Sequence, residues 1–497
     1  MFRRILIANR GEIAVRIIRA CREMGIESVA VFSDADARAL HVSLADHAIR
    51  VGLPPAAASY LSIDAIVSAA RGLRADAVHP GYGFLAENHD FADACAKAGL
   101  TFIGPPADVI RLMGSKIPAR QLAMHAGAPV VPGETPSDQH DSSIAGSARR
   151  IGFPVLLKPA EGGGGIGMKT VRDDTTLLPA IAQARREALA AFGDGTLYVE
   201  RLIEKPRHVE FQILADNRGN VIHLFERECS IQRRHQKVIE ETPSMALTPE
   251  IRARMGDAAV AVARAAGYRN AGTIEFLVEG AGADASFYFL EMNARLQVEH
   301  PVTEQVLGID LVRAQIAVAA GAPLPWPQDQ LTQRGHAIEA RIYAEDPSQD
   351  DLPQAGPLLV YREPSMPGLR IDAGVVEGGE VTVHYDPLIA KVIATGETRD
   401  AARRRLLAAL RSYPILGIRT NVPLLIALLE HPRFISGDLD TRLLDQEGPA
   451  LRAQLAADPS AAALAVAAHA SQARTSGSQA AASTAVDPWA ALSGIRI

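Results

Sequence analysis

Polar and apolar residues alternate along the stretch from Glu291 to Glu299. The odd positions carry acidic, amide and guanidinium groups, whereas the even positions are apolar: Glu291, Asn293, Arg295, Gln297 and Glu299 against Met292, Ala294, Leu296 and Val298. Because successive side chains of an extended chain point to opposite faces, this pattern predicts a strand with its five polar groups on one face. Pro301 lacks an N–H group and would end that strand. The stretch is therefore the first candidate for a polar site.

A second predicted strand, Gly272 to Glu279, precedes this stretch, and a loop of glycine, aspartate and serine joins the two. A hairpin of these strands would place Glu275 close to Glu291. Two carboxylates among apolar neighbours are costly without a cation between them, and together with the Asn293 amide oxygen they suit Mg²⁺. Alternation alone fits an ordinary amphipathic edge strand better, because any half-buried strand shows it. The metal hypothesis therefore depends on the rest of the chain.

Composition narrows the class of protein. With 497 residues, two to four domains are expected, and 48% hydrophobic with 22% charged residues is typical of a globular protein. The net charge of −6 offers no basic surface for nucleic acid or an anionic membrane. The cysteines, Cys21, Cys95 and Cys229, show neither zinc nor disulfide spacing. No apolar run approaches a membrane span, and the apolar run after Arg4 is too short for a signal peptide, which predicts a cytoplasmic protein.

Strand and helix patterns alternate over the first 114 residues. An apolar strand from Arg4 to Ala8 turns into a helix ending near Gly25, and further strands are expected at 28–32, 75–79 and 100–103. This order predicts an open, doubly wound α/β layer. The first turn lacks GxGxxG, so a dinucleotide site is not favoured. The loop from Pro80 to Phe84 fits either a ligand contact or a structural turn.

A glycine-rich loop follows a predicted strand at 153–158 and spans Gly162 to Gly167. Met168 separates Gly167 from Lys169, so this is not a Walker loop, and the strand-like residues that follow exclude the dinucleotide fingerprint. The remaining interpretation is a flexible loop whose N–H groups close over phosphates, with charge from Lys158 and Lys116. An unusually mobile hairpin is the alternative, although successive glycines carry a large entropic cost.

Later segments add further candidates. Residues 198–204 could present backbone and carboxylate groups to a ligand, and residues 226–237 are dense in hydrogen-bond donors, as an anion site would be. The 336–342 segment alternates as a strand. Residues 450–483 are rich in alanine and serine, which predicts a linker-like, partly helical tail.

Four motifs together resemble biotin carboxylase, the ATP-grasp component of biotin-dependent acetyl- or acyl-CoA carboxylases: Ile7–Ala14, His79–Asn88, Arg233–Lys237 and Glu291–Pro301. The resemblance runs from Met1 to about Leu444. It implies an α/β (α+β) fold with a Rossmann-like pre-ATP-grasp domain at 1–114 and an ATP-grasp domain at 115–328. A glycine-loop lid would span about 131–203, a C-terminal biotin carboxylase domain 329–447, and the tail 448–497.

The resemblance also implies a set of site residues. ATP contacts fall on Lys116, Lys158, Gly164, Gly165, Glu200, Arg201, Leu202, Ile203, His208, Gln232 and His235. The metal ions, Mg²⁺ or Mn²⁺, fall on Glu275, Glu291 and Asn293, and bicarbonate falls on Lys237, Arg295, Gln297 and Val298. Glu299 is the implied base, and Arg341 lies beside the biotin ring; with Arg295 and Lys237 they form the implied catalytic set. Ile166 and Arg201 depart from the family pattern, which usually has Lys or Arg at the first and Lys at the second.

The implied reaction is the carboxylation of biotin through carboxyphosphate, the first half-reaction of an acetyl- or acyl-CoA carboxylase. The implied partners are a biotin carboxyl carrier protein or domain and a carboxyltransferase subunit, within a homodimer or a larger complex. No Met-Lys-Met occurs in the chain, so biotin is expected on a partner. Two alternatives stay open: another ATP-grasp ligase of the carbamoyl-phosphate-synthetase kind, and a non-catalytic nucleotide-binding relative.

Overall fold

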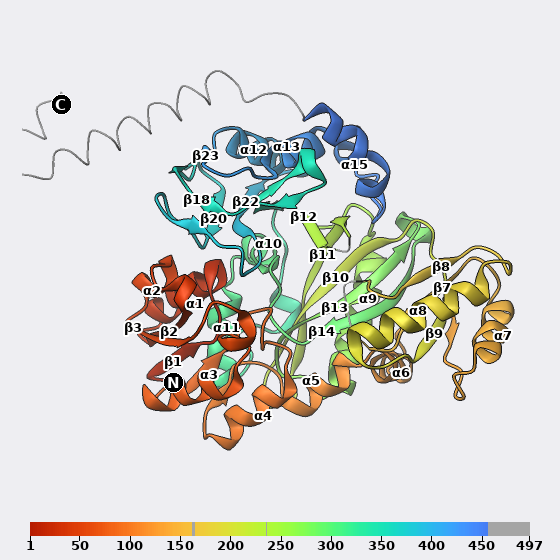
Figure 1. The fold of residues 1–497 in the computed structure, drawn as a ribbon, viewed down its shortest axis with the longest axis horizontal. Helices are drawn as coiled ribbons and strands as arrows, with labels where there is room; N and C mark the ends of the chain where they lie inside the picture. The colour runs from red at the N-terminus through yellow and green to blue at the C-terminus, as the bar shows by residue number, and fades with distance from the viewer. Residues whose placement is uncertain (162–164, 235, 456–497) are drawn as a thin grey trace, which may run out of the picture.

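The structure is a computed structural model that describes residues 1–161, 165–234 and 236–455 (Figure 1). Its main parts are an N-terminal parallel sheet, a small lid sheet and a long antiparallel sheet. In the part of the chain described, no helix combines the length and apolar composition needed to cross a bilayer.

The N-terminal sheet is parallel throughout, in the order β3-β2-β1-β4-β5. Its strands are β1 (Arg4–Ile7), β2 (Glu27–Ser33), β3 (His47–Gly52), β4 (Ala77–His79) and β5 (Thr101–Phe102). The helices of this part are α1 (Gly11–Glu23), α2 (Leu40–Leu44), α3 (Ile63–Gly72), α4 (His89–Lys97) and α5 (Ala107–Gly114). Strand order reverses between β1 and β4, where doubly wound sheets bind ligands at their carboxyl edge. The predicted α/β layer is confirmed.

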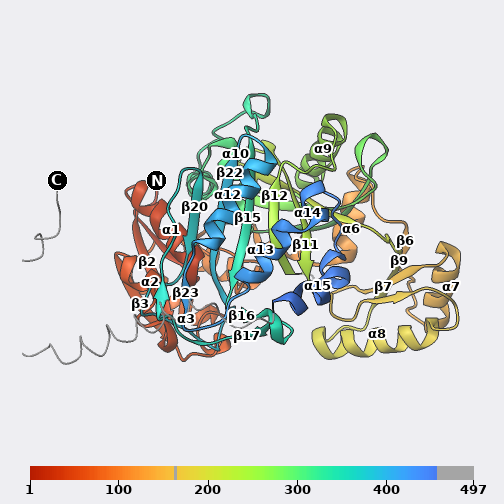
Figure 2. The same cartoon turned by 90° about the horizontal axis from the view of Figure 1, so that it is seen from above.

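The lid is a four-stranded antiparallel sheet in the order β6-β9-β7-β8. Its strands are β6 (Gly133–Glu134), β7 (Val155–Pro159), β8 (Lys169–Val171) and β9 (Leu197–Arg201). Helices α7 (Asp141–Ile151) and α8 (Leu177–Phe192) pack on it and on each other, around an apolar core of their own. Figure 2 shows this unit projecting at one side of the molecule. The glycine-rich segment connects β7 to β8, as the sequence predicts.

The long sheet has eight strands in the order β14-β13-β10-β11-β12-β15-β22-β20, all paired antiparallel. The strands are β10 (Arg207–Ala215), β11 (Val221–Arg233), β12 (Gln236–Thr242), β13 (Asn270–Glu279), β14 (Ser286–Asn293), β15 (His336–Tyr343), β20 (Leu369–Ala373) and β22 (Leu388–Gly396). The accompanying helices are α6 (Lys116–His125), α9 (Pro249–Ala265), α10 (His300–Leu307) and α11 (Leu311–Ala319). Pairing of β12 with β15 makes one continuous sheet from segments on both sides of the Pro-rich stretch at 323–327.

The C-terminal part surrounds β22 with short strands and helices. The strands are β16 (Glu345–Asp346), β17 (Leu352–Pro353), β18 (Gly356–Pro357), β19 (Val360–Tyr361), β21 (Glu380–Val381) and β23 (Ile415–Leu416). The helices are α12 (Arg399–Arg411), α13 (Val422–Glu430), α14 (Pro432–Ser436) and α15 (Leu443–Gln454). Helix α15 continues beyond residue 447, and its Leu451 joins the apolar core. The rest of the predicted tail, from residue 456, lies outside the described residues.

Candidate active site

A cavity of about 490 Å³ lies where the N-terminal sheet meets the long sheet. Its lining includes many of the residues that the resemblance singles out: His208, Lys237, Glu275, Glu291, Asn293, Arg295, Gln297, Val298 and Arg341. The start of α1 and the turn after β4 supply further lining residues, among them Glu12 and Tyr82. Three residues of the Pro80–Phe84 loop, Tyr82, Gly83 and Phe84, therefore line the cavity, and a ligand contact by this loop stays a prediction.

The hairpin β13–β14 places the two acidic residues as predicted. Glu275 lies directly opposite Glu291, and Phe276 lies opposite Phe289. Leu290 is therefore an extra residue, a β-bulge, which reverses the alternation of β14. Phe289 before the bulge is buried in the apolar core, whereas Glu291 after it lines the cavity.

The predicted strand from Glu291 to Glu299 is wrong beyond Asn293, where β14 ends. The physical reason is loss of the strand partner: the last pair is Asn293 with Thr273. Beyond that pair, Glu87 replaces the strand partner: its carboxylate accepts hydrogen bonds from Ala294 N at 2.9 Å and from Arg295 Nε at 2.7 Å.

Pro301 does not end a strand but lies in the first turn of α10, where a missing N–H costs nothing. Arg295, Gln297 and Glu299 are thus presented by an irregular turn. This turn connects β14 to α10 and spans residues 294–299.

Glu299 is completely buried between two cations. Its Oε1 atom lies 2.7 Å from Lys237 Nζ, and its Oε2 atom accepts a hydrogen bond of 2.9 Å from Arg341 Nη2. Lys237 also donates to Glu275 at 2.8 Å and to Glu210. Burial alone would raise the pKa of the Glu299 carboxyl, but the charges of Lys237 and Arg341 hold that pKa well below its usual range. Glu299 is therefore an ionised carboxylate at neutral pH.

Several charged residues of this network are not among the predicted site residues. Arg227 is fully buried on β11 and donates to Glu210 at 2.6 Å. Glu240 on β12 lies 2.5 Å from Arg341, and burial raises its pKa to about 7. A signal existed for Glu210, which shares the face of His208 along an alternating strand. Arg227 lies in the donor-rich segment 226–237, but its contact with Glu210 and that of Glu240 with Arg341 could not be predicted, because both depend on the packing of the folded sheet.

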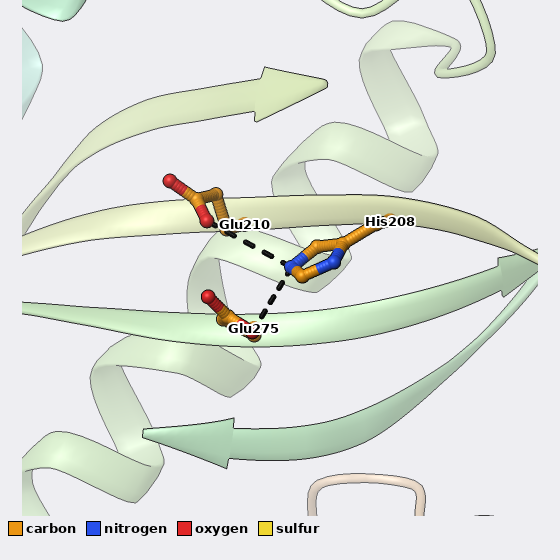
Figure 3. Close-up of side chains that lie close together, drawn as sticks. All are labelled: His208, Glu210 and Glu275. Carbon is orange, nitrogen blue, oxygen red and sulfur yellow. Dashed lines mark ion pairs between the residues drawn. The ribbon is translucent and has the colours of Figure 1, made fainter. Parts of the chain in front are cut away.

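Figure 3 shows His208, Glu210 and Glu275 close together on β10 and β13. His208 Nε2 lies 3.0 Å from Glu275 and 3.8 Å from Glu210, and Gln232 donates to its Nδ1 at 2.6 Å. The three side chains lie close enough together to hold a metal ion, and Glu210 pairs with Arg227 and Glu275 with Lys237. This group is a compensated ion network, in which Glu275 is the carboxylate shared with the predicted metal site.

Glu291 differs from these carboxylates. Within residues 1–161, 165–234 and 236–455, no group donates a hydrogen bond to it, and burial together with the nearby Glu275 raises its pKa. The Asn293 Oδ1 atom, which accepts from Arg295 Nη2 at 2.9 Å, lies on the same strand. Oxygen donors of Glu275, Glu291 and Asn293 fit Mg²⁺, which prefers oxygen ligands.

The remaining predicted nucleotide contacts are not among the residues lining the cavity. They are Lys116, Lys158, Gly165, Glu200, Arg201, Leu202, Ile203 and Gln232. Lys158 pairs with Glu200 at 3.1 Å in the lid sheet. Burial lowers the pKa of Lys116, and the charge of Glu291 opposes that shift. Lys116, at the start of α6, therefore lies near the acidic hairpin.

Two residues that depart from the family pattern also differ in their surroundings. Arg201 donates to Glu279 at 2.9 Å and to Tyr288 at 3.1 Å, so its guanidinium is engaged by the hairpin. Ile166 is half exposed on the lid and brings no charge there. The predicted contacts Gly164 and His235 lie outside the described residues.

A small antiparallel lid sheet beside a long antiparallel sheet with buried acidic and lysine side chains is the arrangement of an ATP-grasp enzyme. The comparisons agree with this class. Residues 115–326 match the family described as "Carbamoyl-phosphate synthase L chain, ATP binding domain". Residues 1–110 match "Biotin carboxylase, N-terminal domain", and residues 339–446 match "Biotin carboxylase C-terminal domain".

Individual proteins similar to this chain identify the kind of ATP-grasp enzyme more closely. The chain is 50% identical over 441 residues to a biotin carboxylase of Halalkalibacterium halodurans, covering 89% of this chain and 97% of that protein. It is 47% identical to the mitochondrial methylcrotonoyl-CoA carboxylase subunit alpha of Mus musculus, over 89% of this chain but only 62% of that subunit. The crystal structure of the biotin carboxylase domain dimer of Hydrogenobacter thermophilus 2-oxoglutarate carboxylase, with MgADP and bicarbonate, superposes with a TM-score of 0.87. That chain is 44% identical, with coverage of 91% of this chain and 99% of that one.

The chain belongs to the biotin carboxylase family. It is an ATP-dependent ligase of the ATP-grasp type, and the predicted family and α/β architecture are confirmed. Matches to biotin carboxylase on both sides of the ATP-binding region argue against the carbamoyl-phosphate-synthetase alternative.

Proposed function

We propose that this chain uses ATP and bicarbonate to carboxylate biotin carried on a partner, with Glu299 as the base. The single observation that carries the proposal is the Glu299 carboxylate, completely buried between Lys237 and Arg341, both of which line the cavity. A base must be unprotonated before the reaction, and the low pKa of Glu299 meets that requirement.

Bicarbonate is bound by Lys237, Arg295, Gln297 and Val298, all of which line the cavity. Arg295 is pre-positioned, since its guanidinium is held by Glu87 and donates to Gln297 at 2.7 Å. Glu299 takes the bicarbonate proton, and a bicarbonate oxygen then attacks the γ-phosphate of ATP, releasing ADP. Mg²⁺ held by Glu275, Glu291 and Asn293 would counter the phosphate charge. Lys116 at the start of α6 and Lys158 on the lid sheet supply further positive charge.

Carboxyphosphate divides into CO₂ and phosphate, and the phosphate removes the ureido N–H proton of biotin. The biotin nitrogen then bonds to the CO₂ carbon. Arg341 stabilises the enolate oxygen of biotin, because its guanidinium is buried and its orientation is fixed by Glu299 and Glu240. No water needs to reorganise around that charge when it forms.

The test measures ADP and carboxybiotin in parallel, with the purified chain, Mg²⁺-ATP, labelled bicarbonate and free biotin. We expect ADP formation to require bicarbonate, to rise with biotin, and to be accompanied by labelled carboxybiotin. ADP formation that is indifferent to biotin would support the carbamoyl-phosphate-synthetase type of ligase. Absence of any turnover would support a non-catalytic nucleotide-binding protein.

We also propose that the chain works as a homodimer or in a larger complex, with a biotin carboxyl carrier and a carboxyltransferase. The proposal rests on its similarity to a domain described as a dimer and to a carboxylase subunit of which it spans 62% of the length. Sedimentation of the chain alone and with candidate carriers tests the assembly. The cytoplasmic location expected from the sequence remains part of the proposal, and cell fractionation tests it.

A further inference from the structure

A buried lysine of β22 lies against the turn at residues 294–299, which carries the proposed bicarbonate contacts. Lys391 on β22 is 0% exposed, and its Nζ atom donates to the Val298 carbonyl oxygen at 2.7 Å. Lys391 is directly opposite Arg341 in the pairing of β15 with β22. Residues opposite each other in an antiparallel pair share one face of the sheet. Two neighbouring cations on one sheet face therefore contact consecutive residues of the turn. Lys391 donates a hydrogen bond to the Val298 carbonyl oxygen, and Arg341 donates one to the Glu299 carboxylate.

The charge of Lys391 is compensated from the N-terminal part of the chain. Glu12 in the first turn of α1 lies 3.2 Å from Lys391 and accepts a hydrogen bond from the Tyr82 hydroxyl. The start of α1 is pressed against the C-terminal part at Gly374, where an added Cβ would lie 2.5 Å from Glu12 N. Glu12 thus has little freedom to move away from Lys391.

The turn itself is fixed on both sides of Val298. The His300 Nδ1 atom lies 2.8 Å from the Gln297 carbonyl oxygen, and because a carbonyl only accepts, Nδ1 carries the proton. Both carbonyls that flank the Val298 amide and α-carbon are therefore held by buried side chains. Within the described residues, no acceptor takes a hydrogen bond from Val298 N–H, and Val298 lines the cavity. This N–H is left available to an anion.

A buried ion pair is a poor device for stability, because its desolvation offsets most of its attraction and well-packed apolar residues often do as well. An apolar residue could fill the space of Lys391, but it could not donate the hydrogen bond that fixes the Val298 carbonyl oxygen. We propose that Lys391, held by Glu12, is a positioning residue for the reaction, because it fixes the Val298–Glu299 peptide and thereby aims the Val298 N–H and the Glu299 carboxylate at bicarbonate. The proposal rests on the proposed roles of Val298 and Glu299.

The first test is Lys391→Met, with Lys97→Met as the matched control on an exposed lysine of α4. We expect the KM for bicarbonate to rise and kcat to fall, with a combined loss of up to about 10²-fold, because misplacement by an ångström can cost that much. The KM for ATP should stay within about twofold, since Lys391 does not touch the lid. A loss of general packing would instead raise both KM values together, and that outcome would overturn the proposal.

Two further variants keep the test decisive if Lys391→Met folds poorly. Glu12→Gln retains the lysine but removes the negative charge of its ion-pair partner, and Gly374→Ala pushes on the backbone of Glu12. Each should raise the KM for bicarbonate selectively. Glu12→Gln combined with Lys391→Met should cost no more than Lys391→Met alone, because both act through one contact. An unchanged KM for bicarbonate in all folded variants would overturn the proposal.

Glu299→Gln, measured in parallel, separates this proposal from the proposed function. If Glu299→Gln abolishes bicarbonate-dependent ADP formation while the Lys391, Glu12 and Gly374 variants behave as the wild type, only the positioning role is wrong. If Glu299→Gln retains full activity, the proposed function is wrong, and the positioning role falls with it.

Discussion

Lys237 contacts both Glu299 and Glu275: its ammonium nitrogen lies 2.7 Å from the Glu299 carboxylate and 2.8 Å from the Glu275 carboxylate. Glu275 belongs to the acidic hairpin proposed to hold the metal, and Glu299 is the proposed base. The Lys237 ammonium therefore pairs with one carboxylate of the proposed metal site and with the proposed base. Substitution of Lys237 is expected to affect both metal binding and proton transfer.

The acid limb of the pH profile tests the coupling of Lys237 to Glu299. The lysine charge is the largest influence that lowers the pKa of the buried Glu299, so Lys237→Met should raise that pKa. A base is lost as pH falls through its pKa; the acid limb of kcat/KM for bicarbonate should therefore move to higher pH, besides an overall loss from weaker bicarbonate binding. Lys205→Met on the surface is the matched control. An acid limb that stays in place would mean that Glu299 is not the titrating base.

The metal assignment is tested by Glu291→Gln. This change removes one carboxylate from the acidic hairpin while keeping its size, so the Mg²⁺ concentration needed for half-maximal ADP formation should rise by at least roughly tenfold, the loss seen when even an outer-shell partner of a metal is removed. Asp284→Asn, in the exposed turn of the same hairpin, should leave the Mg²⁺ dependence unchanged. Wild-type turnover of Glu291→Gln at limiting Mg²⁺ would exclude this hairpin as the metal site.

Arg341→Gln should reduce carboxybiotin formation more than ADP formation. Loss of an oxyanion partner typically costs ~10²–10³-fold, so carboxybiotin formation should fall by that factor, whereas ADP formation should fall less. The ion pair of Arg341 with Glu299 means that some loss in ADP formation is also expected. Phosphate release and labelled carboxybiotin, measured on the same samples, decide the outcome. An equal loss of both products would place Arg341 before the breakdown of carboxyphosphate.

Local sequence patterns predicted the parts of this site that depend on neighbours in the chain. The hairpin of Glu275 and Glu291 was predictable because two strand patterns flank a short polar loop. The bulge at Leu290 also left a trace, since Phe287 and Phe289 are apolar at odd positions where Glu291 and Asn293 are polar. Only the extent of the second strand was wrong, because alternation does not say where a partner strand ends.

Contacts between distant segments could not be predicted in this way. Lys391 meets Val298 and Glu12 only because β22 pairs with β15 and the start of α1 packs against the C-terminal part. Within their own segments, Lys391 and Glu12 resemble ordinary charged residues. Long-range pairing fixes where they meet, and no periodicity in the sequence encodes that pairing.

The central claim, that Glu299 is the base for bicarbonate, is tested most directly by Glu299→Gln. Glutamine keeps the size and hydrogen-bonding capacity of the side chain but cannot accept the proton as a carboxylate does. Bicarbonate-dependent ADP formation should fall by ~10²–10⁴-fold, while the affinity for Mg²⁺-ATP, measured by calorimetry, should stay close to that of the wild type. Retention of wild-type, bicarbonate-dependent ADP formation in Glu299→Gln would contradict the account.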